Sequence, residues 1–286
     1  MSLVWAKTCV YLCVSGNPRT PQRVKNRVII ILTDKTNKMT AEELAIRSSI
    51  QIFQADKNVM KLVGFGTGCV VKYMGHTLLL SVSHVTNDDG LTTFLETNLL
   101  PECNTLKPIG GFVWYDTFKV TDKMDFTDFE SLIENNRERI DVTFSKLTEN
   151  IELKQPELDF GHFKIEADDK LMLDLDYATV PDKDNTYCFY GKVRHEYQGI
   201  YLKMTPALKN GLKFHRTNGY FHMFLAPEII KDKDDYRGCS GAPILDSDGR
   251  IVALACKIVE NTKIVYGFSI QECMKLIKLT IAINQL

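Results

Sequence analysis

Short apolar segments, separated by turn residues and polar loops, dominate the pattern of this 286-residue chain. Residues 64–71 and 77–83 form two such segments around a tight turn, which is typical of a hairpin. In residues 139–147, Val142 and Phe144 fall on the same face, as alternating positions of a β-strand do. The pattern predicts strands near residues 4–14, 27–33, 49–54, 64–71, 77–83, 139–147, 186–193, 199–203, 220–225, 251–258 and 263–269.

Three segments favour helices instead. Residues 40–43 read Thr-Ala-Glu-Glu, a capping box that opens a short helix ending near Arg47. Residues 125–134 carry apolar side chains at helical spacing, and we interpret them as a helix that covers the sheet rather than as a cofactor site. Residues 271–279 predict an amphipathic C-terminal helix. With so many strands and so few helices, the chain is expected to be all-β.

Composition narrows the classes of function. The chain has 35 basic and 36 acidic residues, a net charge of −1 and a pI near 6.6. We therefore expect no basic surface patch that would bind nucleic acid. Its apolar runs are far shorter than the roughly 18 residues that cross a bilayer, and residues 4–14 are a poor signal peptide. We therefore expect no membrane contact and a cytoplasmic location, with the eight cysteines reduced. No cysteine spacing suits a zinc site, and neither a metal nor a cofactor is expected.

The candidate chemistry centres on residues 236–243, which read Tyr-Arg-Gly-Cys-Ser-Gly-Ala-Pro. Glycines on either side allow a tight turn that exposes the hydroxyl of Ser240. The backbone N–H groups of Gly238 and Ser240 would then point to one place, as the donors of an oxyanion hole do. The alternative interpretation is a glycine-rich turn before the strand at residues 251–256.

A serine nucleophile needs a general base and a group that orients it. The last histidine is His222, so a nucleophile elbow with a later histidine is excluded, and the order His, Asp, Ser remains. His84 fits best, because it follows a buried apolar strand. Asp141, at the mouth of the strand in residues 139–147, is the candidate acid, and Asp176 is the alternative.

These motifs together resemble the trypsin-like, chymotrypsin-fold serine peptidases, particularly the disulfide-free bacterial Deg or high-temperature-requirement branch. Coverage is roughly residues 46–279. The matching segments are residues 66–71 (Gly-Thr-Gly-Cys-Val-Val), 81–85 (Ser-Val-Ser-His-Val), 141–144 (Asp-Val-Thr-Phe), 238–243 (Gly-Cys-Ser-Gly-Ala-Pro), 244–254 and 266–270.

The resemblance implies two six-stranded antiparallel β-barrels with a short N-terminal extension and a C-terminal helix. It divides the chain into an extension at residues 1–44, a first barrel at 45–150 that carries His84 and Asp141, and a second barrel at 151–286 that carries Ser240. The residues left over are too few for the PDZ domain that many Deg-type enzymes contain.

Departures from the family's pattern bear on activation and on the nucleophile. Trypsin has an aspartate just before the nucleophile that pairs with a newly cut N-terminus, whereas this chain has Cys239, so that activation route is not expected. Chymotrypsin-fold cysteine proteases exist, but the Gly-x-nucleophile-Gly register assigns the nucleophile to Ser240 rather than Cys239. Ala242 replaces a glycine, which is a small change.

Substrate-pocket candidates follow from the same resemblance. Asp234, six residues before the nucleophile, would lie at the base of the substrate pocket and favour Arg or Lys at P1. Residues 231–235 also resemble a run of solvent-exposed charges. The strand containing Ala255, Cys256 and Lys257 would form a wall of the pocket.

The sequence thus predicts a serine endopeptidase that acts on polypeptides through His84, Asp141 and Ser240. Three alternatives remain open: a protease kept latent by residues 1–39, a degenerate peptide-binding module with the triad held apart, and a non-proteolytic esterase.

Overall fold

The computed structural model describes residues 5–8, 39–56, 61–87, 90–99, 105–118, 137–147, 151–198 and 201–286. The predicted strand at residues 27–33, the predicted helix at 125–134, and Cys9, Cys13 and Cys103 lie outside the described residues. The five cysteines that are described are unpaired and buried.

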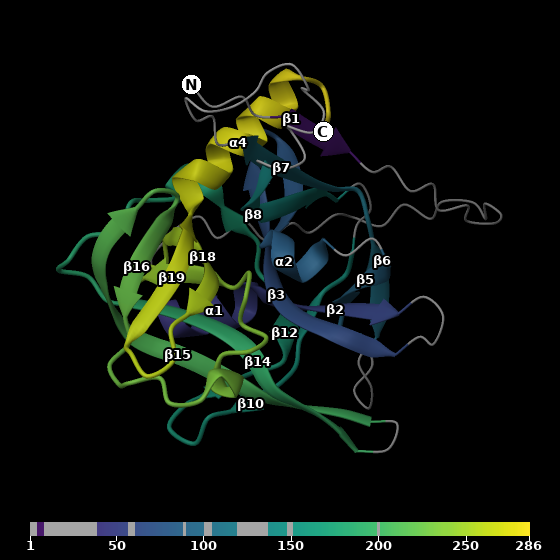
Figure 1. Ribbon diagram of the computed structural model, residues 1–286. Coiled ribbons are helices and arrows are strands. Elements are labelled where there is room, and N and C mark those ends of the chain that lie inside the picture. The colour runs from purple at the N-terminus through teal and green to yellow at the C-terminus, as the bar shows by residue number, and fades with distance from the viewer. Residues whose placement is uncertain are drawn as a thin grey trace.

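The N-terminal half is a nine-stranded sheet with the order β1-β7-β8-β4-β3-β2-β5-β6, and β13 pairs with β3 in parallel. It curls into a half-barrel, purple to teal at the right of Figure 1. Its strands are β1 (Trp5–Thr8), β2 (Ser49–Asp56), β3 (Leu62–Tyr73), β4 (His76–Ser81), β5 (Leu91–Glu96), β6 (Leu106–Ile109), β7 (Phe112–Phe118), β8 (Arg137–Lys146) and β13 (Leu173–Asp174).

The C-terminal half is a closed barrel of six antiparallel strands in the order β14-β15-β16-β19-β18-β17. It lies at the left of Figure 1, and β14 and β15 extend from it beneath the curled sheet. Its strands are β14 (Tyr187–Gln198), β15 (Tyr201–Asn218), β16 (Phe221–Leu225), β17 (Pro243–Asp246), β18 (Ile251–Ile258) and β19 (Ile264–Ser269). The predicted all-β class is confirmed, and a closed six-stranded barrel beside a curled half-barrel sheet is consistent with the predicted chymotrypsin-like pair of barrels.

Two of the three predicted helices fall within the described residues, and both are present. Helix α1 (Ala41–Ser48) begins at Thr40, whose side chain accepts a 3.2 Å hydrogen bond from the N–H of Glu43, as the capping motif requires. Helix α4 (Ile270–Ala282) follows β19 and crosses the top of the molecule in Figure 1. The hydroxyl of Tyr115 on β7 donates to the carbonyl of Leu276 on α4, so this helix joins the two halves. Within the described residues, no helix is both long and apolar enough to span a bilayer.

Between the halves run the short strand pairs β9 (Lys154–Gln155) with β12 (Asp168–Asp169) and β10 (Leu158–Asp159) with β11 (Lys164–Ile165). Since β13 then joins the first sheet, chain beyond residue 150 still packs on that sheet. The division of the chain at residues 44 and 150 stays a prediction.

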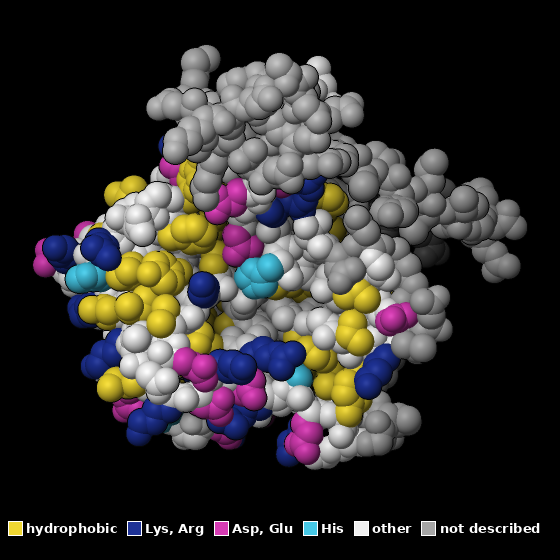
Figure 2. Space-filling model, in the orientation of Figure 1, with side chains coloured by type: hydrophobic (Ala, Val, Ile, Leu, Met, Phe, Trp, Pro, Cys, Tyr) yellow, Lys and Arg dark blue, Asp and Glu magenta, His cyan; other side chains and the backbone are white. Residues whose placement is uncertain are grey.

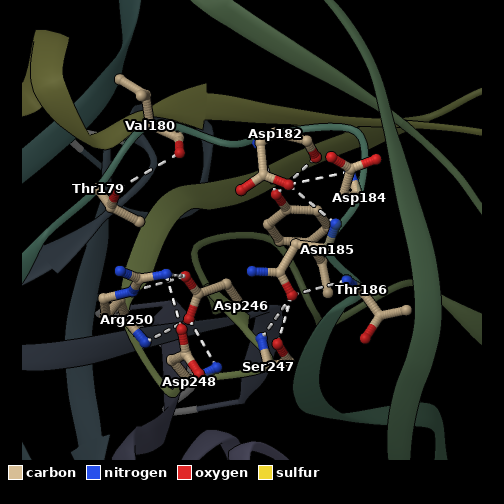
Figure 3. Close-up of polar contacts among 11 residues, drawn as sticks. Thr179, Val180, Asp182, Asp184, Asn185, Thr186, Asp246, Ser247, Asp248 and Arg250 are labelled. Atoms are coloured by element: carbon tan, nitrogen blue, oxygen red, sulfur yellow. Dashed lines mark hydrogen bonds and ion pairs between the residues drawn. The ribbon is translucent and has the colours of Figure 1, made fainter.

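A buried aspartate closes the turn between β17 and β18 (Figure 3). Asp246, 1% exposed, accepts hydrogen bonds from the N–H of Asp248 at 3.0 Å and from the N–H and Nε of Arg250 at 2.8 Å each. A buried carboxylate needs such donors. This turn fixes the two strands that follow the segment containing Ser240.

Candidate active site

His84 and Asp141 come from adjacent elements of the curled sheet. Strand β4, whose leucines at 78–80 are fully buried, ends at Ser81, and His84 lies in the short helix α2 (Ser83–Thr86) directly after it. Asp141 lies on the neighbouring strand β8. The Nδ1 atom of His84 is 2.9 Å from Oδ1 of Asp141 and 3.0 Å from Oδ2. The structure therefore brings these two predicted residues together.

Asp141 is fixed by more than the imidazole. Its Oδ1 also accepts from the hydroxyl of Ser83 at 3.1 Å and from the N–H of His84 at 3.3 Å. Burial would raise the pKa of Asp141, but the hydrogen bonds from His84 and Ser83 and the charge of His84 hold that pKa below its usual range. A carboxylate at Nδ1 favours the tautomer protonated there, which leaves Nε2 as the basic nitrogen.

The loop that carries Ser240 needs its glycines. Gly238 and Gly241 have φ values of +107° and +89°, which other residues rarely adopt. A Cβ at Gly238 would collide with the carbonyl of Lys192, and one at Gly241 with the carbonyl of Thr67. The loop therefore passes too close to both halves of the protein for larger residues.

The two N–H groups predicted to form an oxyanion hole are free in this loop. Neighbouring N–H groups already have partners. The N–H of Cys239 donates to the carbonyl of Tyr236 at 2.9 Å, and the N–H of Gly241 donates to the carbonyl of Ala255 at 2.7 Å. Within the described part of the chain, the N–H groups of Gly238 and Ser240 make no hydrogen bond. Unpaired N–H groups beside a serine hydroxyl are the arrangement that binds a developing oxyanion.

Thr67, on β3 of the first half, holds this loop. Its hydroxyl donates to the carbonyl of Gly238 at 2.6 Å, and its N–H donates to the carbonyl of Ser240 at 2.7 Å. The Thr67 carbonyl in turn accepts from the hydroxyl of Ser81 at 2.7 Å. The family-like segment at residues 66–71 predicted this strand. The hydrogen bonds from Thr67 to the loop could not be predicted, because the loop is distant in the sequence and no local pattern indicates them.

The hydroxyl of Ser240 points to β18 in this structure. It donates to the carbonyl of Cys256 at 3.3 Å and, among the described residues, makes no hydrogen bond to His84. Burial, followed by the charge of Asp141, raises the pKa of the Cys256 thiol well above its usual value. Residue 256 thus lies near both Asp141 and Ser240, which come from different halves.

A cavity of about 560 Å³ adjoins Ser240. Of the predicted pocket residues, Ala255, Cys256 and Lys257 line this cavity, whereas Asp234 is exposed outside it. Asp234 belongs to the 3-10 turn η2 (Lys233–Asp235), and its neighbour Lys233 lines the cavity instead. Figure 2 shows the molecule hollowed near the centre of this face, with charged side chains gathered along the lower edge.

Other candidates lie away from this arrangement. Asp176 is exposed on the 3-10 turn η1 (Leu175–Tyr177) and makes no contact with His84. Cys239 is buried, and burial raises the pKa of its thiol to about 12, so this residue is not a thiolate at neutral pH. The geometry therefore favours Asp141 and Ser240 over these two alternatives.

His195, which the sequence did not single out, lies behind the loop. Its ring stacks on Phe65 with centroids 4.0 Å apart and lies against Gly238. Burial, followed by the charge of Arg237, lowers the pKa of His195 to about 4. This imidazole is therefore neutral at physiological pH and adds no charge beside the loop.

The chain was compared with protein-family models, curated proteins and solved structures. No protein-family model and no curated protein matches the chain. Among solved structures, the serine endoprotease from Yersinia pestis is similar, at 11% identity and a TM-score of 0.43, over 86% of this chain and 68% of that one. The HtrA-type protease AlgW, solved with a tripeptide, is similar at 12% identity and a TM-score of 0.40, over 84% and 62% respectively. The likeness to both structures concerns the fold, so the activity has to be argued from this chain's own residues.

Proposed function

We propose that this protein is a serine endopeptidase that hydrolyses peptide bonds through Ser240, His84 and Asp141. The observation that carries the proposal is the pairing of His84 Nδ1 with the Asp141 carboxylate, at 2.9 and 3.0 Å. This pairing leaves Nε2 of His84 as a base, as nucleophilic catalysis by serine requires.

In the proposed reaction, Ser240 Oγ attacks the carbonyl carbon of the scissile bond while Nε2 of His84 takes the hydroxyl proton. The same proton passes to the leaving amine, and an acyl-enzyme on Ser240 remains until water hydrolyses it. Asp141 stabilises the imidazolium that forms. The unpaired N–H groups of Gly238 and Ser240 stabilise the tetrahedral oxyanion, and one donor of this kind contributes about 2.7–4 kcal/mol.

One contact favours a second candidate function. The hydroxyl of Ser240 donates to the carbonyl of Cys256 rather than to His84. For catalysis, the Ser240 side chain has to leave this acceptor, and catalytic hydrogen bonds often form only when substrate binds. A protein that keeps the bond to Cys256 would bind peptides in the cavity without cleaving them.

Hydrolysis of denatured casein distinguishes the two functions. The endopeptidase predicts new peptide termini that appear with the wild-type protein and not with the Ser240→Ala or His84→Ala variants. A wild-type protein that binds casein-derived peptides and releases no new termini would be the binding module instead.

A further inference from the structure

Three cations line the cavity beside Ser240. They are Lys233, Arg237 and Lys257, all exposed at its mouth, and Glu260 is the single carboxylate among the lining residues. The lining therefore carries three positive charges against one negative charge. None of the three cations forms an ion pair with any described residue.

Two carboxylates close to the cavity pair with an arginine that does not line it. Asp232 and Asp235 both pair with the Nη2 atom of Arg194, at 3.0 and 2.6 Å. Glu260 accepts a 3.4 Å hydrogen bond from the N–H of Lys233. A fourth cation lies close by, because the Nζ atom of Lys209 is 4.2 Å from the ring centroid of Tyr236, a lining residue.

The deeper wall of the cavity is apolar. Phe189 and Val265 are each 1% exposed and line the cavity together with Ala255. Charges at the mouth of a cleft with low-dielectric walls have their field concentrated there, which raises the local concentration of ligands of opposite charge. The excess of positive charge in the lining thus favours a negatively charged ligand beside Ser240.

We propose that the substrates are acidic polypeptide segments, in which Asp or Glu residues flank the scissile bond and contact Lys233, Arg237 and Lys257. This proposal rests on the proposed function, since it takes Ser240 as the nucleophile. It reverses the expectation drawn from Asp234, because that carboxylate lies outside the cavity and a lysine lines the cavity in its place. The apolar wall receives the uncharged side chain at the cleaved position.

The test uses internally quenched nonapeptides with a central Phe-Ala bond whose neighbouring positions are all Glu, all Gln or all Lys. Glu and Gln have the same shape, so their comparison isolates charge. We expect kcat/KM to be about fivefold or more higher for the Glu peptide than for the Gln peptide, and lowest for the Lys peptide. The difference should shrink between 50 and 500 mM salt, because the cations are exposed.

Variants assign the preference to the cavity. The Lys233→Gln, Arg237→Gln and Lys257→Gln variants should each reduce the Glu-to-Gln ratio. Lys275→Gln on α4, where Lys275 pairs with Glu272 at 2.7 Å, is the matched control and should leave the ratio unchanged. The rate at which a small uncharged fluorophosphonate probe labels Ser240, measured in each variant, separates a change at the nucleophile from a change in charge preference.

Binding to the Ser240→Ala protein repeats the test without catalysis, with fluorescein-labelled versions of the same peptides and fluorescence anisotropy as the readout. Equal affinity for the Glu and Gln peptides, or a preference for Lys, would overturn the proposal of acidic substrates. Labelling of the wild-type protein by the probe would still support Ser240 as the nucleophile in that case. Preferential binding of the Glu peptide without cleavage by the wild-type protein would keep the charge preference and reject the endopeptidase.

Discussion

The N–H of Thr67 donates a 2.7 Å hydrogen bond to the carbonyl of Ser240, and this bond joins the two halves of the chain at the candidate nucleophile. The Thr67 hydroxyl adds a second bond, to the carbonyl of Gly238 at 2.6 Å. Thr67 holds these two carbonyls, and the N–H groups of Gly238 and Ser240 make no hydrogen bond to any residue that the structure describes. The first half thus contributes the candidate base and the candidate acid, and it also holds the loop of the second half.

Removing the Thr67 hydroxyl should impair catalysis more than substrate binding. Thr67→Val keeps the shape of the side chain but leaves the carbonyl of Gly238 unpaired, so the loop loses one restraint on the oxyanion donors. We expect kcat to fall by about 10- to 100-fold with KM little changed, as measured by steady-state peptide hydrolysis.

Thr67→Ser is the control for this prediction. It restores a hydroxyl at the same position and should recover most of the lost kcat. A Thr67→Val protein that turns over at the wild-type rate would show that the hydroxyl does not position the loop.

Replacing Asp141 by asparagine should nearly abolish turnover. The asparagine amide would donate to Nδ1 of His84 and favour the tautomer protonated at Nε2, which cannot accept the proton of Ser240. In the chymotrypsin-like triad the same change costs about 10⁴ in kcat, and we expect a loss of that order here.

Asp176→Asn is the matched variant, because Asp176 is exposed and makes no contact with His84. It should leave kcat unchanged. A large loss in this variant, with little loss in Asp141→Asn, would reassign the acid.

The stability of the fold should depend on pH through Lys170. Its Nζ is enclosed and donates to the carbonyl of Ile46 at 2.9 Å and to Oε1 of Gln155 at 2.6 Å. Burial, followed by the charge of Lys192, lowers the pKa of Lys170 to about 7. Between pH 7 and about 10.4 the unfolded chain therefore binds the proton that the folded protein lacks, and the free energy of unfolding gains a term that rises with pH.

Urea unfolding of the wild-type protein and of Lys170→Met measures that term. The wild-type protein should gain stability relative to the variant as pH rises from 7 to 9.5, by at most about 1.4 kcal/mol per pH unit, with a constant difference below pH 7. A difference that stays constant over the whole range would mean that Lys170 is charged in the folded protein.

Local signals in the sequence predicted much of the fold. The capping box at Thr40 gave helix α1, and the turn at Met74 and Gly75, which both have positive φ, gave the β3–β4 hairpin. Strand β15 was underestimated, because Pro206 and Gly211 are strand-breaking residues inside it. Pairing with β14 on one side and β16 on the other carries the strand through both positions.

The candidate site was predictable only in part. His84 and Asp141 could be chosen because His84 directly follows a strand with a clear apolar pattern and Asp141 lies in one. The sequence could not show that Lys233 rather than Asp234 lines the cavity. Counting back from Ser240 assumes a loop of fixed length and shape. The bonds made by Thr67 depend on how the two halves pack, which no short segment encodes.

The most direct test of the account is the rate at which a fluorophosphonate probe modifies Ser240, located by mass spectrometry of the labelled peptide. We expect rapid labelling of the wild-type protein at Ser240, a loss of at least 10³ in rate in His84→Ala, and no labelling in Ser240→Ala. A folded wild-type protein that resists the probe, or a Ser240→Ala protein labelled as fast as the wild type, would contradict the assignment of Ser240 as a nucleophile activated by His84.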